Sequence, residues 1–242
     1  MGKVQVVGIG PGDYEGMTIR AARALGACDV IVGYTVYVEL VREHFPDKEF
    51  RSTPMTREAE RCRIAFEEAA LGKTAAMICS GDPGVYGMSG LILAVGAEYP
   101  EIPVEVIPGV TAAASGAALL GAPLIHDFAV ISLSDRLTPW EKIERRLRLA
   151  AEADLVLCLY NPASRKRADY LAHACDILLE VLPPDRICGT ARRIGREGEE
   201  TALHTLHGLR DFPADMFTTV FIGNSQTEEM GGHMVTPRGY VL

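Results

Sequence analysis

Three short apolar runs in the first half of the chain each end in a glycine-rich turn. The runs are Val4–Val7, Thr74–Cys79 and Val104–Ile107, and segments with helical spacing separate them. Short apolar runs bounded by glycine and proline are typical of buried strands. Because strands that alternate with helices usually pair in parallel, this pattern predicts an α/β layer fold.

The remaining segments of the first half continue this alternation. A further strand is expected at Val30–Val32, and helices are expected at Thr18–Leu25, around Tyr37–Glu43, at Glu58–Leu71 and at Ser89–Tyr99. The hydroxyl group of Thr18 is suited to cap the first of these helices. The charged spacing of Glu58–Leu71 predicts an amphipathic helix with one face in water.

Residues 108–123 interrupt the rhythm. An alanine- and glycine-rich helix at Thr111–Leu120 leads into Gly121, Ala122 and Pro123, which resemble a hinge. We therefore expect two α/β domains, residues 1–118 and 119–242. In the second domain we expect strands at 128–133, 155–160, 187–191, 201–206 and 219–222, with helices at 140–151 and 167–182. No long helix separates the last strands, so a mixed sheet is predicted.

The net charge and the spacing of the cysteines indicate which partners and which cellular compartment to expect. A net charge of −8 over 242 residues disfavours a nucleic-acid partner, because neutralising phosphates needs a basic surface. No two of the six cysteines have C-x-x-C spacing, and several lie in apolar runs, so we expect reduced core thiols in a cytoplasmic protein. The beginning of the chain has no signal-peptide pattern, and the apolar stretches are too interrupted to cross a membrane.

The first glycine-rich turn, Gly8–Asp13, has the sequence GIGPGD. Its place after a strand and before a helix is that of a dinucleotide-binding loop, and Asp29 lies at about the distance of a ribose-binding acid. However, Asp13 stands where that motif requires a third glycine, and Pro11 lacks an amide that a pyrophosphate would bind. A tight turn without a ligand remains an alternative.

The second and third turns also follow strands. Gly81–Gly87 has the sequence GDPGVYG, and Pro108–Ala112 has the sequence PGVTA. Glycines allow a backbone to approach a ligand closely, and open α/β sheets bind ligands beyond the carboxyl ends of their strands. We therefore expect the second turn to bind a ligand. Thr111 is expected either to cap the following helix or to face that ligand.

In this order, the three turns resemble the signatures of the tetrapyrrole (corrin/porphyrin) methylase family over nearly the whole chain. The second half resembles the branch that methylates ring carbon C17 of a cobalamin precursor, precorrin-3B or cobalt-factor III, with coupled ring contraction. The segments that carry this closer resemblance are Leu159–Pro162, Arg165–Arg167, Ala191–Arg196 and Thr219–Ser225.

The resemblance implies an S-adenosylmethionine (SAM)-dependent methyltransferase, a homodimer whose two α/β domains hold SAM in the cleft between them. The product of SAM is S-adenosylhomocysteine, and the substrate is an anionic tetrapyrrole. The residues implied around the cofactor are Pro11, Gly81, Asp82, Val85, Tyr86, Thr111, Ala112, Tyr160, Asn161, Ala191, Arg192 and Thr219.

Methyl transfer from a sulfonium needs no enzymic nucleophile, because the electron-rich macrocycle supplies the attacking carbon. The enzyme mainly positions the reactants and excludes water. Ring contraction also requires proton transfer, for which Asp13 and His126 are the candidate catalytic residues. Asp13 as a helix cap and His126 as a structural or surface histidine remain open.

A corrin precursor carries many carboxylates, so cations are expected around it. Two clusters follow expected strand ends, and from them Arg165, Lys166, Arg193 and Arg196 are the candidate substrate-binding residues. A solvated surface is the alternative for each cluster. His204 and His207 have neither a nearby cysteine nor a catalytic glutamate, so no metal site is expected there.

Three other functions remain open from the sequence. The chain could act at another ring carbon or on a target that is not a tetrapyrrole. It could be a nicotinamide-dependent oxidoreductase built on Gly8–Asp13, or a nucleotide-binding regulatory module without catalysis. Retention of SAM on purification separates the methyltransferases from the last two.

Overall fold

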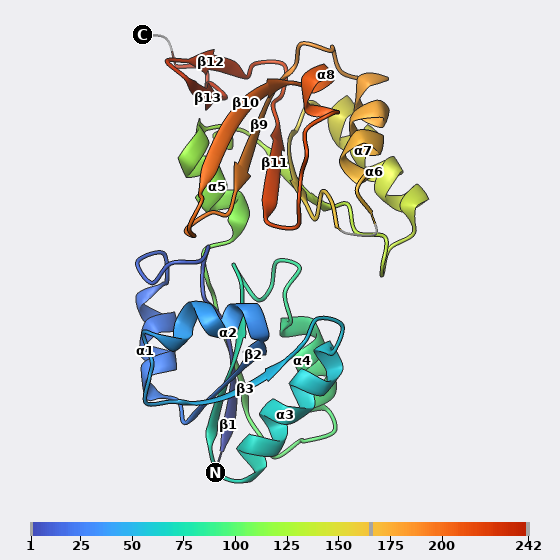
Figure 1. The fold of residues 1–242 in the computed structure, drawn as a ribbon. Helices are drawn as coiled ribbons and strands as arrows, with labels where there is room; N and C mark the ends of the chain where they lie inside the picture. The colour runs from blue at the N-terminus through green and yellow to red at the C-terminus, as the bar shows by residue number, and fades with distance from the viewer. Residues whose placement is uncertain (1, 165–166, 241–242) are drawn as a thin grey trace. The chain divides into compact units, whose positions relative to one another are not determined.

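The computed structural model describes residues 2–164 and 167–240. The chain divides into two compact units, Met1–Thr111 and Ala112–Leu242. Each unit contains a five-stranded sheet (Figure 1). The expected α/β class is confirmed.

The first unit has a fully parallel sheet of order β3-β2-β4-β1-β5. Its strands are β1 (Lys3–Gly8), β2 (Val30–Tyr34), β3 (Glu49–Thr53), β4 (Thr74–Cys79) and β5 (Val104–Ile107). Strand β3 was not expected from the sequence. It is a polar strand at the sheet edge, so it lacks the apolar run that marks a buried strand.

Four helices cover the two faces of this sheet: α1 (Ile19–Ala27), α2 (Thr35–Arg42), α3 (Glu58–Ala70) and α4 (Ser89–Gly96). Alternate strand residues point to opposite faces. Val4 and Val6 pack with α3 and α4, whereas Val7 packs with α1 and α2. The predicted cap of α1 is confirmed, because the Thr18 side chain accepts a hydrogen bond from the Ala21 N–H.

The second unit has a sheet of order β10-β9-β11-β8-β7. Its strands are β7 (Phe128–Ser132), β8 (Val156–Tyr160), β9 (Ile187–Arg192), β10 (Glu200–Thr205) and β11 (Thr218–Ile222). Strands β7 and β8 are parallel, and the other neighbours are antiparallel. The predicted mixed sheet is therefore confirmed.

Helices α6 (Trp140–Glu152), α7 (Tyr170–Leu179) and α8 (Leu206–Leu209) pack on one face of this sheet. The other face carries α5 (Ala112–Leu120) and a small sheet of β12 (Glu228–Met230), β13 (His233–Val235) and β6 (Gly121–Ala122). The sequence pattern did not indicate the hairpin β12–β13, whose residues are mostly exposed.

Helix α5 packs on the second sheet because its small residues let the backbone come close. A Cβ atom on Gly116 would lie 3.0–3.1 Å from side-chain atoms of Ile194 and Phe221. The helix therefore belongs to the second unit, and the division after Thr111 comes earlier than the expected boundary at residue 118.

The six cysteines are buried and free of disulfides, as the apolar runs predicted. Burial raises the pKa of Cys28 to about 11 and that of Cys79 to about 12, so these thiols stay protonated at neutral pH. Among the described residues, no helix has the length and hydropathy of a membrane span.

Candidate cofactor and substrate site

The three glycine-rich turns of the first unit meet backbone to backbone at the carboxyl ends of β1, β4 and β5. A Cβ atom on Gly109 would lie 2.1 Å from the Gly81 oxygen, and one on Gly8 would lie 2.6 Å from the same oxygen. No side chain fits at either position. The sequence pattern predicts a ligand at the second turn, but it does not indicate that Gly8 and Gly109 let the turns approach one another.

Gly10 and Gly81 join the first two turns through a pair of hydrogen bonds. The Gly81 N–H donates to the Gly10 oxygen at 2.7 Å, and the Gly10 N–H donates to the Gly81 oxygen at 3.2 Å. Both residues have a positive φ, +74° and +68°, which glycine adopts without strain. This pair of hydrogen bonds fixes the position of the first turn relative to the second.

Asp82 braces the second turn from within. Its Oδ1 atom accepts a hydrogen bond from the Gly84 N–H at 2.7 Å, and its Oδ2 atom accepts one from the Gly109 N–H at 3.0 Å. The carboxylate therefore joins the second and third turns. Val85, which follows, is half-buried and donates its N–H to the Asp82 carbonyl at 3.3 Å.

Tyr86 has a φ of +54° and is 56% exposed. A non-glycine residue in the left-handed region is uncommon and often marks a functional turn. The next residue, Gly87, closes this turn against Pro83, because a Cβ atom there would lie 2.6 Å from the Pro83 oxygen. The exposed Tyr86 therefore lies in a turn that is tightly packed between Pro83 and Gly87.

In the first turn, Pro11 is half-buried and Asp13 is exposed. The Asp13 Oδ1 atom accepts a hydrogen bond from the Gly16 N–H at 2.7 Å. Because Thr18 caps α1, Asp13 shapes the preceding turn instead of capping that helix. This contact leaves its predicted catalytic role untested.

The second unit brings Tyr160 to the start of α5. Its hydroxyl oxygen accepts a hydrogen bond from the Ala113 N–H at 2.6 Å, in the first turn of the helix. Such amides have no partner inside the helix and carry partial positive charge. Thr111 and Ala112 directly precede Ala113 and are half-buried.

Asn161 follows β8 with a φ of +56° and is exposed. Its side-chain Nδ2 atom donates to the Ser132 Oγ atom at 2.9 Å, which ties the end of β8 to the end of β7. Asparagine tolerates this left-handed conformation better than most residues. The predicted pair Tyr160–Asn161 thus forms a defined corner of the second unit.

Ala191 and Thr219 are opposite each other in the β9–β11 ladder, and both are buried. Two predicted cofactor residues from distant parts of the sequence therefore lie side by side. Arg192 is next to Ala191 at the end of β9.

Arg192 is held by two carboxylates. Its Nε donates to Asp215 Oδ2 at 2.8 Å, and its Nη1 donates to Glu200 Oε1 at 2.9 Å. Burial alone would raise the pKa of Asp215, but hydrogen bonds from Arg192, Phe217 and Thr218 outweigh it and lower that pKa. These contacts give Arg192 a structural role that the sequence did not indicate.

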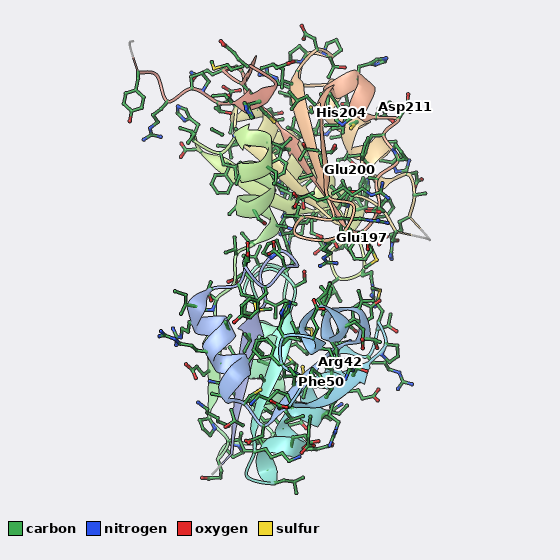
Figure 2. All side chains as sticks on the ribbon, turned by 60° about the vertical axis from the view of Figure 1, so that its left-hand side comes forward. Arg42, Phe50, Glu197, Glu200, His204 and Asp211 are labelled. Carbon is green, nitrogen blue, oxygen red and sulfur yellow. The ribbon has the colours of Figure 1, made fainter. Side chains whose placement is uncertain are left out.

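Arg193 and Arg196 lie in the loop between β9 and β10. Arg193 is exposed and has a φ of +51°, and the Arg196 guanidinium lies 5.1 Å from the centroid of the Phe217 ring. Glu197 lies in the same loop, and Glu200 is the first residue of β10 (Figure 2). The other two predicted substrate residues, Arg165 and Lys166, lie outside the described residues.

His126 is half-buried in the segment between β6 and β7. His204 and His207 occupy different elements, β10 and α8, and His204 Nε2 lies 3.0 Å from the Thr190 Oγ1 atom. No group of three or more potential metal ligands occurs among the described residues.

The position of Asp29 argues against a nicotinamide-dependent oxidoreductase. It precedes β2, at the amino edge of the sheet, and its Oδ2 atom accepts a hydrogen bond from the Thr74 N–H at 2.7 Å. A ribose-binding acid would be needed at the carboxyl edge, where Gly8–Asp13 lies. The residue therefore organises the start of β4 instead.

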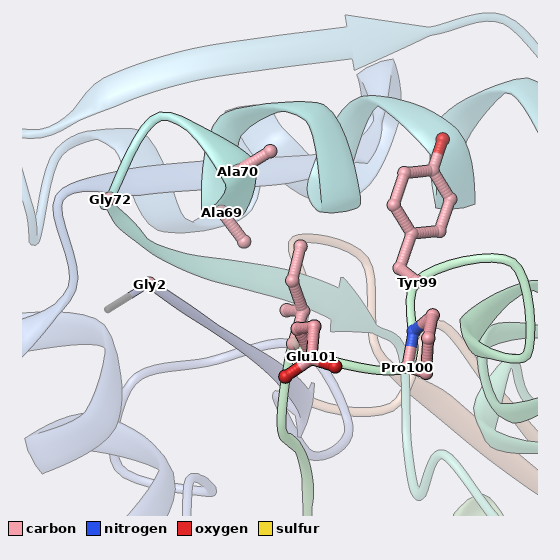
Figure 3. A pocket seen from close by; sticks show the side chains of 8 residues that line it. Gly2, Ala69, Ala70, Gly72, Tyr99, Pro100 and Glu101 are labelled. Atoms are coloured by element: carbon pink, nitrogen blue, oxygen red, sulfur yellow. The ribbon is translucent and has the colours of Figure 1, made fainter.

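A cavity of about 350 Å³ lies elsewhere in the first unit (Figure 3). Its lining comes from Gly2, the end of α3, Gly72 and residues 99–102, and among these described residues Glu101 alone is charged. Gly2 precedes β1, so this cavity is at the amino edge of the sheet. It contains none of the predicted site residues.

Comparison with known proteins gives the site its context. The sequence profile of the Tetrapyrrole (Corrin/Porphyrin) Methylases matches residues 3–209. A protein of Salmonella typhimurium named probable cobalt-factor III C(17)-methyltransferase is 47% identical over 99% of this chain and 100% of its own length. A precorrin-3B C(17)-methyltransferase of Sinorhizobium sp is 40% identical, over 99% and 97% of the two chains.

Some relatives are longer. The chain matches 45% of a cobalt-factor III methyltransferase of Priestia megaterium, at 44% identity over 99% of this chain. Among solved structures, the methyltransferase CobJ has a TM-score of 0.89 and 36% identity, over 98% of this chain and 100% of that one. A uroporphyrin-III C-methyl transferase of Thermus thermophilus, complexed with S-adenyl homocysteine, has a TM-score of 0.72 at 23% identity, over 91% and 97% of the chains, and supports the fold. With the profile matching most of the sequence and full-length relatives above 30% identity, this chain belongs to the tetrapyrrole (corrin/porphyrin) methylase family.

Proposed function

We propose that this protein transfers the methyl group of SAM to ring carbon C17 of a cobalamin precursor, precorrin-3B or cobalt-factor III, with coupled ring contraction. The observation that carries the proposal is the full-length match to the Salmonella typhimurium relative, at 47% identity. The glycine turns that carried the sequence resemblance also meet at one edge of the first sheet, where α/β proteins bind ligands.

The residues of the first unit fit the cofactor in two respects. Gly8, Gly81 and Gly109 let the three turns pack backbone to backbone at the strand ends, which is where α/β proteins bind ligands. The exposed Tyr86 follows directly on the turn that Asp82 braces. We propose that Pro11, Gly81, Asp82, Val85 and Tyr86 contribute to SAM binding.

The second unit, with Thr111 at the end of the first, offers a different set of groups. The α5 N-terminus with Thr111 and Ala112 provides amides of positive polarity, and Tyr160 and Asn161 form a corner at the end of β8. Ala191 and Thr219 form a buried pair between β9 and β11, and Arg192 follows Ala191 in the chain. We propose that these residues contact SAM, and its position relative to the two units stays a prediction.

SAM supplies an activated methyl group on its sulfonium, and the macrocycle supplies the attacking carbon. The protein then has to bind, orient and exclude water. Asp13 and His126 remain the proposed residues for holding or moving a proton during ring contraction. Arg193, Arg196, Arg165 and Lys166 are proposed to bind substrate carboxylates, because an acidic chain needs local cations for a polyanion.

Direct assay tests the proposal. Purified protein is incubated with cobalt-factor III or precorrin-3B and with SAM carrying a ¹³C-methyl group. The expected product gains one methyl group by mass and shows the label on C17 by NMR. Label on another ring carbon would reassign the reaction within the family, and no label together with no SAM binding by calorimetry would refute a methyltransferase.

We further propose that the protein is a homodimer and works in the cytoplasm. Six free, buried thiols support a reducing compartment. Sedimentation equilibrium tests the dimer, since a monomer mass of 26.2 kDa is expected to double in solution.

A further inference from the structure

Arg61 is a buried cation near the carboxyl ends of β2 and β3. It lies in the first turns of α3 and is only 5% exposed. Its guanidinium carbon lies 5.9 Å from the centroid of the Tyr34 ring, and Tyr34 is paired with Thr53 at the last position of the β2–β3 ladder. The charge thus occupies the sheet edge at which the glycine turns also lie.

The contacts of Arg61 satisfy hydrogen bonds without neutralising its charge. Nε donates to the Thr53 hydroxyl at 3.0 Å, and Nη2 donates to the Pro54 carbonyl at 3.1 Å. Across the described residues, no carboxylate forms an ion pair with Arg61 within 4.0 Å. Buried charges are ordinarily paired, because leaving water is costly for an isolated ion.

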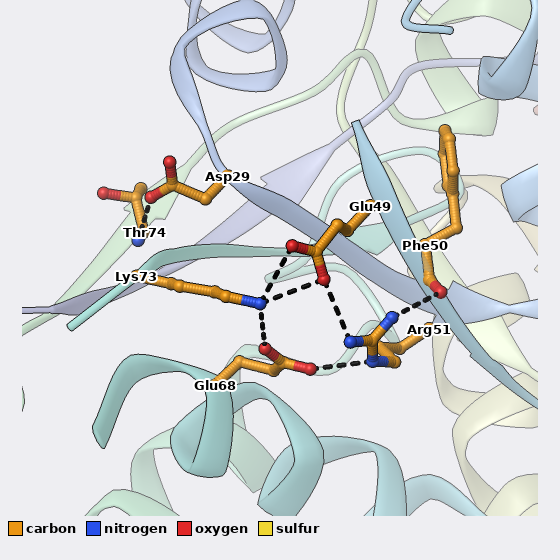
Figure 4. A network of polar contacts seen from close by, with 7 residues as sticks. All are labelled: Asp29, Glu49, Phe50, Arg51, Glu68, Lys73 and Thr74. Atoms are coloured by element: carbon orange, nitrogen blue, oxygen red, sulfur yellow. Dashed lines mark hydrogen bonds and ion pairs between the residues drawn. The ribbon is translucent and has the colours of Figure 1, made fainter. Parts of the chain in front are cut away.

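The opposite end of the same helix–strand contact shows the usual arrangement (Figure 4). Glu68, also on α3, has a side chain 10% exposed and contacts Arg51 at 2.7 Å and Lys73 at 2.8 Å. Glu49 extends the cluster to Lys73 at 2.9 Å. At the amino edge of the sheet, the buried carboxylate of Glu68 is therefore paired with two cations. At the carboxyl edge, the buried guanidinium of Arg61 has only neutral hydrogen-bond acceptors among the described residues.

The segment beside Arg61 is exposed and strained. Residues 54–57 are exposed, and Thr56 has a φ of +73°, which is unfavourable for a β-branched residue. Such conformations are energetically costly and cluster at ligand clamps and switch segments. Arg61 holds the first residue of this segment through the Pro54 carbonyl.

We propose that Arg61 receives one carboxylate of the substrate, and that segment 54–57 moves aside to admit it. The planar Nη1–Nη2 side of a guanidinium fits a carboxylate with two parallel hydrogen bonds. The Tyr34 ring lies beside the guanidinium, and the Tyr37 ring packs edge to face against Tyr34 at 5.2 Å. The inference rests on the proposed function only in taking the substrate to be a tetrapyrrole polycarboxylate.

The test compares Arg61→Gln with Arg63→Gln. Arg63 is on the same helix but is exposed and weakly paired with Glu98 at 3.8 Å, so its replacement removes the same charge from the surface. The probes are cobalt-factor III and uroporphyrin, an unreactive polycarboxylate macrocycle, with SAM as the separate ligand. Arg61→Gln should raise the Kd of both macrocycles about ten- to a hundredfold and leave the Kd of SAM within about twofold.

Arg61→Lys keeps a positive charge without the planar fork and should give an intermediate macrocycle Kd. It also serves if Arg61→Gln does not fold. Raised salt should weaken macrocycle binding more in wild type than in Arg61→Gln. Wild-type macrocycle affinity in a folded Arg61→Gln or Arg61→Lys protein, or an equal loss in Arg63→Gln, would overturn the inference. Failure of wild type to methylate C17 while it binds uroporphyrin would instead refute the proposed function.

Discussion

Asp82 accepts a hydrogen bond from the Gly109 N–H at 3.0 Å, and this contact ties the turn after β4 to the turn after β5. The two residues are 27 positions apart, so the strand order brings them together. The other carboxylate oxygen binds the Gly84 N–H. One side chain thus sets the spacing of two turns that we propose contact SAM.

Asp82→Ala is expected to weaken SAM binding and to lower the free energy of unfolding by about 1–3 kcal/mol. Two backbone N–H groups lose their acceptor, and the two turns lose their brace. Calorimetric titration with SAM and urea unfolding measure the two effects. Asp47→Ala, at an exposed position, is the control. Unchanged SAM affinity would remove Asp82 from the site.

Gly109→Ala is expected to lower the free energy of unfolding by at least about 3 kcal/mol and to abolish SAM binding. The new Cβ atom would lie 2.1 Å from the Gly81 oxygen, and neither backbone can retreat without separating the turns. Gly90→Ala is the matched control, since a Cβ atom there meets nothing within 4 Å in α4. It should be neutral or stabilise by up to about 1 kcal/mol. Equal thermal stability of the two variants would contradict the close contact.

Arg193→Ala or Arg196→Ala is expected to raise the Kd of the tetrapyrrole about ten- to a hundredfold and to leave SAM affinity nearly unchanged. An arginine–carboxylate pair that is partly exposed to solvent contributes about 1–3 kcal/mol to the binding free energy. Lysine at the same position should rescue only in part. Arg23→Ala, an exposed substitution on α1, controls for net charge. If both variants keep wild-type tetrapyrrole affinity, or lose mainly SAM affinity, the loop does not bind substrate as proposed.

Arg192→Ala is expected to lower the free energy of unfolding by about 1–2 kcal/mol. The substitution leaves the carboxylate of Asp215 without its partly buried cation. Urea unfolding of Arg192→Ala and of the double variant Arg192→Ala/Asp215→Asn measures how much the interaction of the two residues contributes to the free energy of unfolding. The double variant should recover part of the loss, and a purely additive result would show that the two residues do not interact.

Glu68→Gln is expected to make unfolding less sensitive to acid. Hydrogen bonding from Lys73, together with the charge of Arg51, lowers the pKa of Glu68 against the opposing effect of burial. A lowered pKa in the folded state adds stability above the ordinary glutamate pKa, and that stability is lost as pH falls through the lowered value. Urea unfolding between pH 7 and pH 3 should therefore show the difference between wild type and variant shrinking with acid. Glu15→Gln, at an exposed position, is the control, and a constant difference would contradict the linkage.

Sequence patterns were sufficient for the elements that bury apolar side chains. Val4–Val7 and Thr74–Cys79 appear in strands β1 and β4, because strands covered on both faces consist mostly of apolar residues. The mixed second sheet followed from the lack of helices between the last strands. Strand β3 and the hairpin β12–β13 escaped prediction, because edge and surface strands satisfy backbone hydrogen bonds without an apolar pattern.

For the site, the sequence by itself determined the family and the three glycine turns, since glycine and proline fix backbone conformation locally. Only the tertiary structure decided what those glycines contact. Residue 109 cannot carry a side chain, because the Gly81 oxygen occupies the space where its Cβ atom would lie. It also separated Arg192, held by Asp215, from the exposed Arg193 beside it. The burial of Arg61 likewise depends on α3 packing against β3. Such contacts join residues far apart in the chain, and no local pattern encodes the free energy of bringing them together.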